Sequence, residues 1–569
     1  MIVLLVVTAL TVLVAVIGAV TLVGRPRSTT DFLVASQAVP ALWNTSALTS
    51  EFISVAAFLG TAGLVLAYGI DMLWLPIGAA AGHVVLQAFV TAPLRRSGTF
   101  TLLDFAEWRL GSRVVQKTVS ACVCFIGWFY LLPQFQSAGV TLRVVAGLPV
   151  WVGWAVVVVV TLAIVFTGGM RSITVMRAFR FWLKLVAVAI PAVALVAVWH
   201  LDSDHDPSRP ESPYFVRDTT VAIDLDVAIR VPVGTGAEIA GVLDGERYDG
   251  DHVVLEPGTH VLGEGTRLTF PAGATVPHAT RLPLRSGDNW AMPFGRGGDH
   301  PLFTTYSVLI GMLLGTMGLP QVVVRFCPNT CGRAARRTAA MVPALLALFC
   351  IFPTLYGALG RLYAPGLLMT GDGDATILML PHRLAPGLPG SLLTGLIAAG
   401  AFAAFTSASC GIVVAIAGSI SQCVPRGGVR SFRISALIAI TVPLILVAWI
   451  GPLGSAGLVT LACAVSACSL CPLLVLGVWW RRLTPVGAAA GLVVGCALAV
   501  MAALAHIFGG PRDGWSGALL GQPTIVIVPF TFAVMVLVSL LTPLRVPAGV
   551  DRVMARLHLP EELTTDRSR

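Results

Sequence analysis

The chain has 569 residues, of which 56% are hydrophobic and 11% are charged, and its mean hydropathy is +0.86. A soluble globular protein of this length carries far more charge, so the composition excludes that class and indicates a protein that crosses a membrane many times. The formal net charge of +9 does not point to nucleic-acid binding, because membrane topology explains where the basic residues lie.

Thirteen windows of about 20 mostly apolar residues predict membrane spans. The first window lacks a basic start and a small-residue cleavage site, so we expect an additional N-terminal span there rather than a signal peptide. In chain order the windows cover residues 1–23, 45–67, 72–94, 119–142, 149–170, 179–200, 302–324, 339–363, 387–421, 432–451, 454–478, 486–508 and 523–543.

Basic residues lie mainly in every second loop between these windows. One set of short loops contains clusters such as Arg95 with Arg96 and Arg481 with Arg482. The other set contains only Arg143, Arg361, Arg383 and Arg512. Since cytoplasmic loops are enriched in Lys and Arg, we predict a multi-pass plasma-membrane protein with its N-terminus outside and its tail, 544–569, in the cytoplasm.

Residues 201–300 differ in composition from the rest of the chain, being rich in Asp, Gly, Pro and Thr. The stretches TTVAIDLDVAIRVPV and HVVLEPGTHVLGEGTRLTFPAG alternate apolar and polar residues and predict short strands separated by turns. The number of preceding spans places this β-rich insert on the extracytoplasmic side. We interpret it as a small cap, and a ligand-binding domain is the alternative.

Motifs of the common enzyme classes are absent from the sequence. There is no H-E-x-x-H, no Walker-type glycine loop and no G-x-S-x-G, and the predicted spans contain no paired carboxylates. The eleven cysteines lie in predicted spans or cytoplasmic loops, so no disulfide framework is expected. Cys468 and Cys471 are interpreted as small packing residues. We therefore predict that the protein is not an enzyme.

The seventh window, LIGMLLGTMGLPQVVVRF, contains helix-breaking residues from Gly315 to Pro320 where a span should be most regular. Unwound backbone at membrane depth is tolerated only where it faces protein or a cavity. Five spans earlier, Gly60 and Gly63 interrupt the second window. Glycines also serve close helix packing, but a matched pair of interruptions favours a transporter built from two inverted repeats of five spans, 45–200 and 301–480, with two further spans in 486–543.

Four motifs resemble the sodium:solute symporter family. They are FTGGMRSITVMRAFRFWLK after span 5, GTMGLPQVVVRF in span 7, AAGAFAAFTSASCG in span 9 and LGVWWRRLTPVGAAAG after span 11. The stretches SEFISVAAFLGTAGLV, YLLPQFQSAG and RFCPNTCGRAARRT are most similar to the acetate and monocarboxylate permease branch, particularly its actinobacterial members. The resemblance implies an all-α leucine-transporter-like fold and Na+-coupled uptake of a small carboxylate such as acetate, propionate or pyruvate.

Three alternatives to that function stay open. The protein would be a proton-coupled carrier of another small solute, a receptor that binds its solute without moving it, or a channel. The closed site at the bilayer midplane favours a carrier over a channel, and the short tail is unlike a signalling domain. The sequence leaves the exact substrate and the oligomeric state open.

The same resemblance implies a Na+ site between spans 2 and 9. Its ligands would be the backbone carbonyls of Ser50 and Ile53 on span 2, with Ala404, Ser407 and position 408 on span 9. The family usually has Ser or Thr at the last position, where this chain has Ala408. Losing one polar contact to a charge costs about 1.5 to 3 kcal/mol. Three possibilities stay open: water replaces the missing hydroxyl, Na+ binds weakly, or another cation, H+ in particular, drives transport.

The substrate site is expected where spans 2, 4 and 7 meet. The candidate residues are Ser54, Phe58, Tyr130, Gln134, Gly315, Thr316 and Gly318.

Glu51 and Lys184 are candidates for ion coupling, because ionisable residues inside spans are functional suspects. The alternative for Lys184 is that its long stem extends to the cytoplasmic interface. The alternative for Glu51 is a structural pair with a neighbouring helix.

Overall fold

The computed structural model describes residues 41–99, 101–167, 170–201, 213–223, 226–280, 282, 287–293, 300–323, 332–424, 428–449, 454–508 and 514–559. The predicted span 1–23 and the end of the tail, 560–569, lie outside the described residues.

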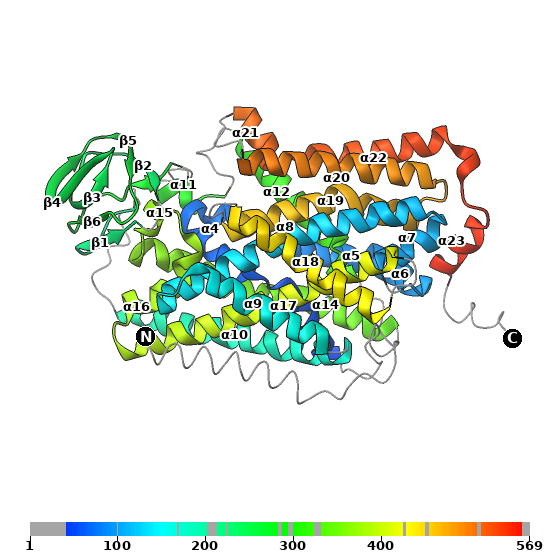
Figure 1. Ribbon diagram of the computed structural model, residues 1–569, viewed down its shortest axis with the longest axis horizontal. Coiled ribbons are helices and arrows are strands. Elements are labelled where there is room, and N and C mark those ends of the chain that lie inside the picture. The colour runs from blue at the N-terminus through cyan, green and yellow to red at the C-terminus, as the bar shows by residue number, and fades with distance from the viewer. Residues whose placement is uncertain are drawn as a thin grey trace.

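The molecule is an elongated bundle of long helices that run roughly along its longest axis, with a β-sheet at one end and α23 at the other (Figure 1). Within the described ranges, ten helical segments are long and apolar enough to cross a membrane. The helices before the sheet are α3 (Ala41–Phe52), η1 (Ala56–Gly60), α4 (Thr61–Tyr68), η2 (Gly69–Leu73), α5 (Trp74–Leu86), η3 (Gln87–Thr91), α6 (Ala92–Ser97), α7 (Leu102–Leu110), α8 (Arg113–Ala146), α9 (Val150–Thr167) and α10 (Met170–Leu201).

The helices after the sheet form the second half of the bundle. They are α11 (Gly287–Ala291), α12 (Pro301–Gly318), α13 (Pro320–Val323), α14 (Gly332–Tyr363), α15 (Leu367–Thr370), η4 (Gly373–Ala375), α16 (Thr376–Leu384), α17 (Leu388–Cys423), α18 (Val429–Trp449), α19 (Ser455–Trp479), α20 (Pro485–Phe508), α21 (Gly514–Gly521), α22 (Thr524–Leu541), η5 (Pro543–Arg545) and α23 (Val550–His558). The apolar stretches of α17 and α19 are buried almost throughout, so these two helices form the centre of the bundle.

The interruption of the second predicted span lies earlier than the glycines suggested. Helix α3 ends at Phe52, Ile53 and Ser54 are not helical, and the chain turns helical again at Val55 before the π-helical turn η1. A Cβ at Gly60 would lie 2.6 Å from the Oγ of Ser455. The expectation of a break near Gly60 was therefore wrong, because the glycine allows a close approach to α19 instead.

The interruption of span 7 is short and occurs at the end of the predicted stretch. Helix α12 runs through Gly315 to Gly318, and only Leu319 is extended, with φ −62° and ψ 120°, before α13 begins at Pro320. Proline lacks an N–H and restricts the preceding residue to extended conformations, which explains the position. Ser466 of α19 donates a hydrogen bond to the carbonyl of Gly315 at 2.9 Å.

The insert contains an antiparallel sheet with strand order β1-β6-β3-β5-β2-β7, and β4 pairs with β3. The strands are β1 (Thr219–Ala222), β2 (Val227–Val231), β3 (Thr235–Leu243), β4 (Glu246–Leu255), β5 (Gly258–Leu262), β6 (Arg267–Phe270) and β7 (His278–Ala279). Side chains of β3 alternate between buried and exposed, as expected for a sheet covered on one face. Its apolar core is shared with Leu66 at the end of α4 and with Leu367 and Leu368 of α15.

Candidate functional site

Two polar side chains of α8 meet the broken end of the second span. The backbone N–H of Val55 donates to the Oε1 of Gln134 at 3.3 Å, and the hydroxyl of Tyr130 donates to the Oγ of Ser54 at 3.2 Å. Tyr130 and Gln134 are four residues apart and therefore lie on the same helix face. A break inside a membrane leaves backbone groups without helical partners. Gln134 of α8 supplies a hydrogen-bond acceptor for one of them, the N–H of Val55.

A small cavity of about 40 Å3 borders this break. Its polar lining comes from Ser54, Thr61, Tyr130 and Thr460. Its apolar lining is Phe52, Ala56, Ala57, Leu75, Pro76, Ala79, Met312, Leu346, Cys350, Ala456 and Val459. A cavity needs about 10 to 15 Å3 of such volume for each water-sized group, so this cavity holds roughly three of them.

The hydroxyls around the cavity are not equivalent. Thr61 donates to the carbonyl of Ala56 at 3.0 Å, and Thr460 donates to the carbonyl of Ala456 at 2.8 Å. Both hydroxyl protons are therefore used within their own helices. The Oγ of Ser54 accepts from Tyr130, which leaves its proton as the donor best placed for a bound anion.

The structure brings together only some of the substrate residues predicted from sequence. Ser54 and Tyr130 line the cavity, and Gln134 supports the break beside it. Phe58 instead packs against Phe349, with ring centroids 5.8 Å apart, and does not line this cavity.

The predicted residues of α12 also lie elsewhere. Gly315 and Gly318 approach the backbone of α19, where a Cβ at Gly318 would lie 2.9 Å from the carbonyl oxygen of Ser466. The buried hydroxyl of Thr316 has no hydrogen-bond partner. The Cβ of Thr316 lies against Gly82 of α5. Helix α12 contributes Met312, one turn before Thr316, to the cavity. Helical spacing from Thr316 was the signal that would have found Met312.

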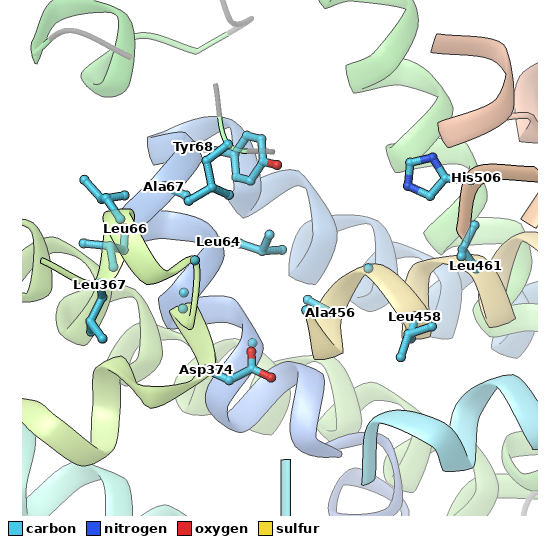
Figure 2. Close-up of a pocket in the computed structure, with 18 of the residues that line it drawn as sticks. Leu64, Leu66, Ala67, Tyr68, Leu367, Asp374, Ala456, Leu458, Leu461 and His506 are labelled. Carbon is cyan, nitrogen blue, oxygen red and sulfur yellow. The ribbon is translucent and has the colours of Figure 1, made fainter. Parts of the chain in front are cut away.

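A larger space of about 220 Å3, here called the vestibule, lies next to the cavity on the side of the sheet. Figure 2 shows Leu64 and Tyr68 of α4 on one side of it, and Ala456, Leu461 and His506 on the other. Ala456 lines both the cavity and the vestibule. The two spaces therefore meet at Ala456.

Hydrogen bonds converge on Asp374, which lines the vestibule. The carboxylate of Asp374 in η4 accepts from the hydroxyl of Ser137 at 3.0 Å, and from the hydroxyl and backbone N–H of Ser455 at 3.0 and 3.2 Å. These contacts join η4, α8 and α19. Gly63 of α4 lies against Gly373 at the same place.

The residues expected to hold Na+ also come together, but around a different cation. The hydroxyls of Ser50 and Ser407 are 3.2 Å apart. The Nζ of Lys184 donates to the carbonyls of Ser50 and Ile53 at 2.5 and 2.8 Å. Lys184 has no exposed surface, so the alternative in which it extends to the interface was wrong: the broken end of α3 provides backbone oxygens inside the bundle.

The donor set at this position does not fit Na+. The ion prefers several oxygen ligands, yet the Lys184 ammonium already takes the two carbonyls, and Ala408 presents a methyl group. Ala404 and Ala408 are both buried on α17, beside Ser407. The hydroxyl of Ser407 contacts only Ser50 among the hydrogen bonds of the described residues.

Glu51 forms a buried ion pair with a residue of α10. The Nη1 of Arg177 lies 2.8 Å from its Oε2, and the two side chains are 1% and 3% exposed. A Cβ at Gly411 of α17 would overlap the carboxylate of Glu51, so the glycine is what allows the carboxylate this position. The pair joins α3 to α10, as expected from the structural alternative for Glu51.

Comparisons with known proteins agree with this architecture. The family model described as "Sodium:solute symporter family" matches residues 32–202 and 297–495. An uncharacterized symporter of Cupriavidus necator is 26% identical, with 96% of this chain and 92% of that protein covered. A monocarboxylic acid transporter of Corynebacterium glutamicum is also 26% identical, with 90% and 86% covered.

Two solved structures share the fold. A Na+-coupled sialic acid symporter, in a substrate-bound outward-open state, has a TM-score of 0.62 at 13% identity, with 94% of this chain and 98% of that chain covered. A nucleobase-cation-symport-1 family transporter in a closed conformation has a TM-score of 0.52 at 12% identity, with 94% and 100% covered. The fold is therefore that of leucine-transporter-like carriers, and the protein is a multi-pass membrane transporter rather than an enzyme. The chain belongs to the sodium:solute symporter family.

Proposed function

We propose that the protein is a secondary active transporter that moves a small monocarboxylate by alternating access, coupled to a cation. Membership of the family implies a solute and a coupling cation. The observation that carries the proposal is the small cavity at the broken second span, where Tyr130 holds Ser54 and leaves one hydroxyl proton for an anion. The relative in Corynebacterium glutamicum supports the substrate class.

The start of the second half-helix favours a negatively charged substrate. The helical stretch η1–α4 begins after Ser54, and its first residues, Ala56 and Ala57, line the cavity. The first N–H groups of a helix lack helical partners and carry partial positive charge, which stabilises an anion. A carboxylate next to Ser54 receives both this field and a hydrogen bond.

The remaining walls fit a short hydrocarbon tail. Met312, Leu346 and Val459 present apolar surface opposite the break. A cavity with room for about three water-sized groups suits acetate closely and propionate or pyruvate with slight expansion. A charged side chain does not line the cavity among the described residues, so the site recognises a carboxylate by dipoles rather than by an ion pair.

Alternating access requires two closures to open in turn. On the sheet side, the substrate passes through the vestibule when the contacts of Asp374 with Ser455 and Ser137 separate. On the other side of the break, the Glu51–Arg177 pair and Lys184 join α3 to α10. Release to that side requires α3 to move relative to α10.

The organisation proposed from the sequence fits this cycle. Spans 45–200 and 301–480 form two inverted repeats, each with a broken first helix, and 1–23 and the spans in 486–543 flank them. The insert of 201–300 then lies outside the cell and the tail, 544–569, inside, which makes the vestibule the outer entrance. The asymmetric distribution of Arg and Lys supports this orientation.

Family membership and the Na+-coupled neighbour support Na+ as the driving ion, and H+ is the alternative. The test is uptake of labelled acetate, propionate and pyruvate into proteoliposomes under a Na+ gradient and, separately, under a proton gradient. We expect saturable accumulation above equilibrium under one of the two gradients. Binding of acetate without accumulation under either gradient would identify a receptor and refute the proposal.

A further inference from the structure

We infer that the ammonium group of Lys184 is the resident cation between α3 and α17, and that Na+ does not bind there. The inference concerns the ion coupling of the transporter proposed above and rests on that function only for its physiological meaning. Two hydrogen bonds carry it: Lys184 Nζ to the carbonyl of Ser50 at 2.5 Å and to that of Ile53 at 2.8 Å.

These carbonyls are the ones that the break leaves without helical partners. Helix α3 ends at Phe52, so the carbonyl of Ser50 lies in its last turn, and Ile53 lies in the non-helical link. The last carbonyls of a helix carry partial negative charge and need donors or cations. An ammonium group with three N–H donors satisfies both oxygens at once, which is the role a metal ion would otherwise have.

The side of the site formed by α17 offers one hydroxyl fewer than the family pattern. Ala408 offers a methyl group, and the hydroxyl of Ser407 lies 3.2 Å from the Oγ of Ser50 and 3.5 Å from its carbonyl oxygen. Among the described contacts, the hydroxyl of Ser407 is therefore the side-chain oxygen that α17 offers to an ion at this position. Few oxygens next to an ammonium group make a poor metal site and a satisfied lysine site.

The surrounding charges further disfavour a second cation. Arg177 and Arg180 are three residues apart, and Arg180 and Lys184 are four residues apart, which places all three on one face of α10. All three are buried. Glu51 of α3 is paired with Arg177. Among the described residues, this face of α10 thus has three basic side chains and one ion pair with a carboxylate, and Na+ would add to the excess of positive charge.

The first test measures Na+ binding by thermal unfolding of the purified full-length protein in NaCl and in choline chloride. We expect the difference in Tm between NaCl and choline chloride to be the same for the wild type and for Ser407→Ala. A rise in the wild type that Ser407→Ala removes would place Na+ at this site and overturn the inference. A rise of equal size in both proteins places Na+ elsewhere, as the inference requires. This comparison leaves Lys184 unchanged and so does not depend on a disruptive variant.

The second test removes the ammonium group. Lys184→Ala frees the two carbonyls and leaves space, so we expect NaCl to raise its Tm relative to choline chloride. Lys184→Met fills the same volume without charge, and we expect no such rise. Equal responses of the two variants would contradict the inference. Acetate uptake by the wild type is measured separately, so a wrong substrate would leave both ion-binding results standing.

Discussion

Replacing Gly63 with alanine tests the closure between the vestibule and the cavity. A Cβ at Gly63 would lie 2.5 Å from the carbonyl carbon of Gly373 and 2.8 Å from its Cα. All of these neighbours are backbone atoms, so no side chain can rotate away. Helix α4 and η4 must therefore move apart in the substituted protein.

The cost follows from the overlap. Adding a methylene to a packed contact costs about 1 to 3 kcal/mol. Alanine also favours a helix over glycine by about 1 kcal/mol, but this gain is present whether the passage is open or closed. Only the clash therefore changes the free-energy difference between the closed and open states. We expect Gly63→Ala to shift it towards the open state by about five- to 150-fold.

The assay is modification of a cysteine introduced at Ala456, which lines both spaces, by a membrane-impermeant thiol reagent. We expect faster labelling of Ala456→Cys when Gly63→Ala is present. The matched control is Gly457→Ala on the same vestibule wall, where an added Cβ meets no atom within 4 Å. Equal labelling rates in the Gly63→Ala, Gly457→Ala and unsubstituted backgrounds would refute the assignment of this contact as the closure.

Three further outcomes are expected. Tyr130→Phe removes one buried hydrogen bond, worth about 0.5 to 1.5 kcal/mol, so KM for acetate rises about two- to tenfold with little change in Tm; an unchanged KM would contradict the site. Glu51→Gln leaves the buried Arg177 without a counter-charge, which costs about 3 to 5 kcal/mol, so we expect the Tm to fall. The control Asp551→Asn breaks an exposed ion pair and leaves the Tm nearly unchanged. In the sheet, desolvation lowers the pKa of His260, but its hydrogen bonds to Asp244 at 2.6 Å and to a backbone carbonyl outweigh this and raise it. The stabilisation is complete below the unfolded pKa of about 6.5 and is lost as pH rises through the higher folded value. Hydrogen-exchange protection of β5, corrected for intrinsic rates, therefore falls as pH rises above about 6.5, and His260→Ala shows no such fall.

Local sequence patterns located the long apolar helices of the described residues but not the functions of individual glycines. Apolar windows predict spans because each helix must satisfy its own backbone in lipid. Gly60 and Gly63 were expected to break the second span, yet each is matched to a neighbour hundreds of residues away, Ser455 and Gly373. A glycine that unwinds a helix and one that admits a close contact look alike in sequence, since only the partner distinguishes them.

The sequence by itself determined that the chain is a polytopic transporter of this family, and its motifs placed Ser50, Ile53 and Ser407 in one group. It also singled out Tyr130 and Gln134 on α8 as substrate candidates, because they belong to an unusually polar and aromatic run around Pro133. Only the tertiary structure decided that the span breaks at Ile53 and Ser54, and that Lys184 extends to the carbonyls there rather than to the interface. The reason is physical: hydropathy depends on neighbouring residues, whereas the fate of a long charged side chain depends on which oxygens another helix brings within its reach.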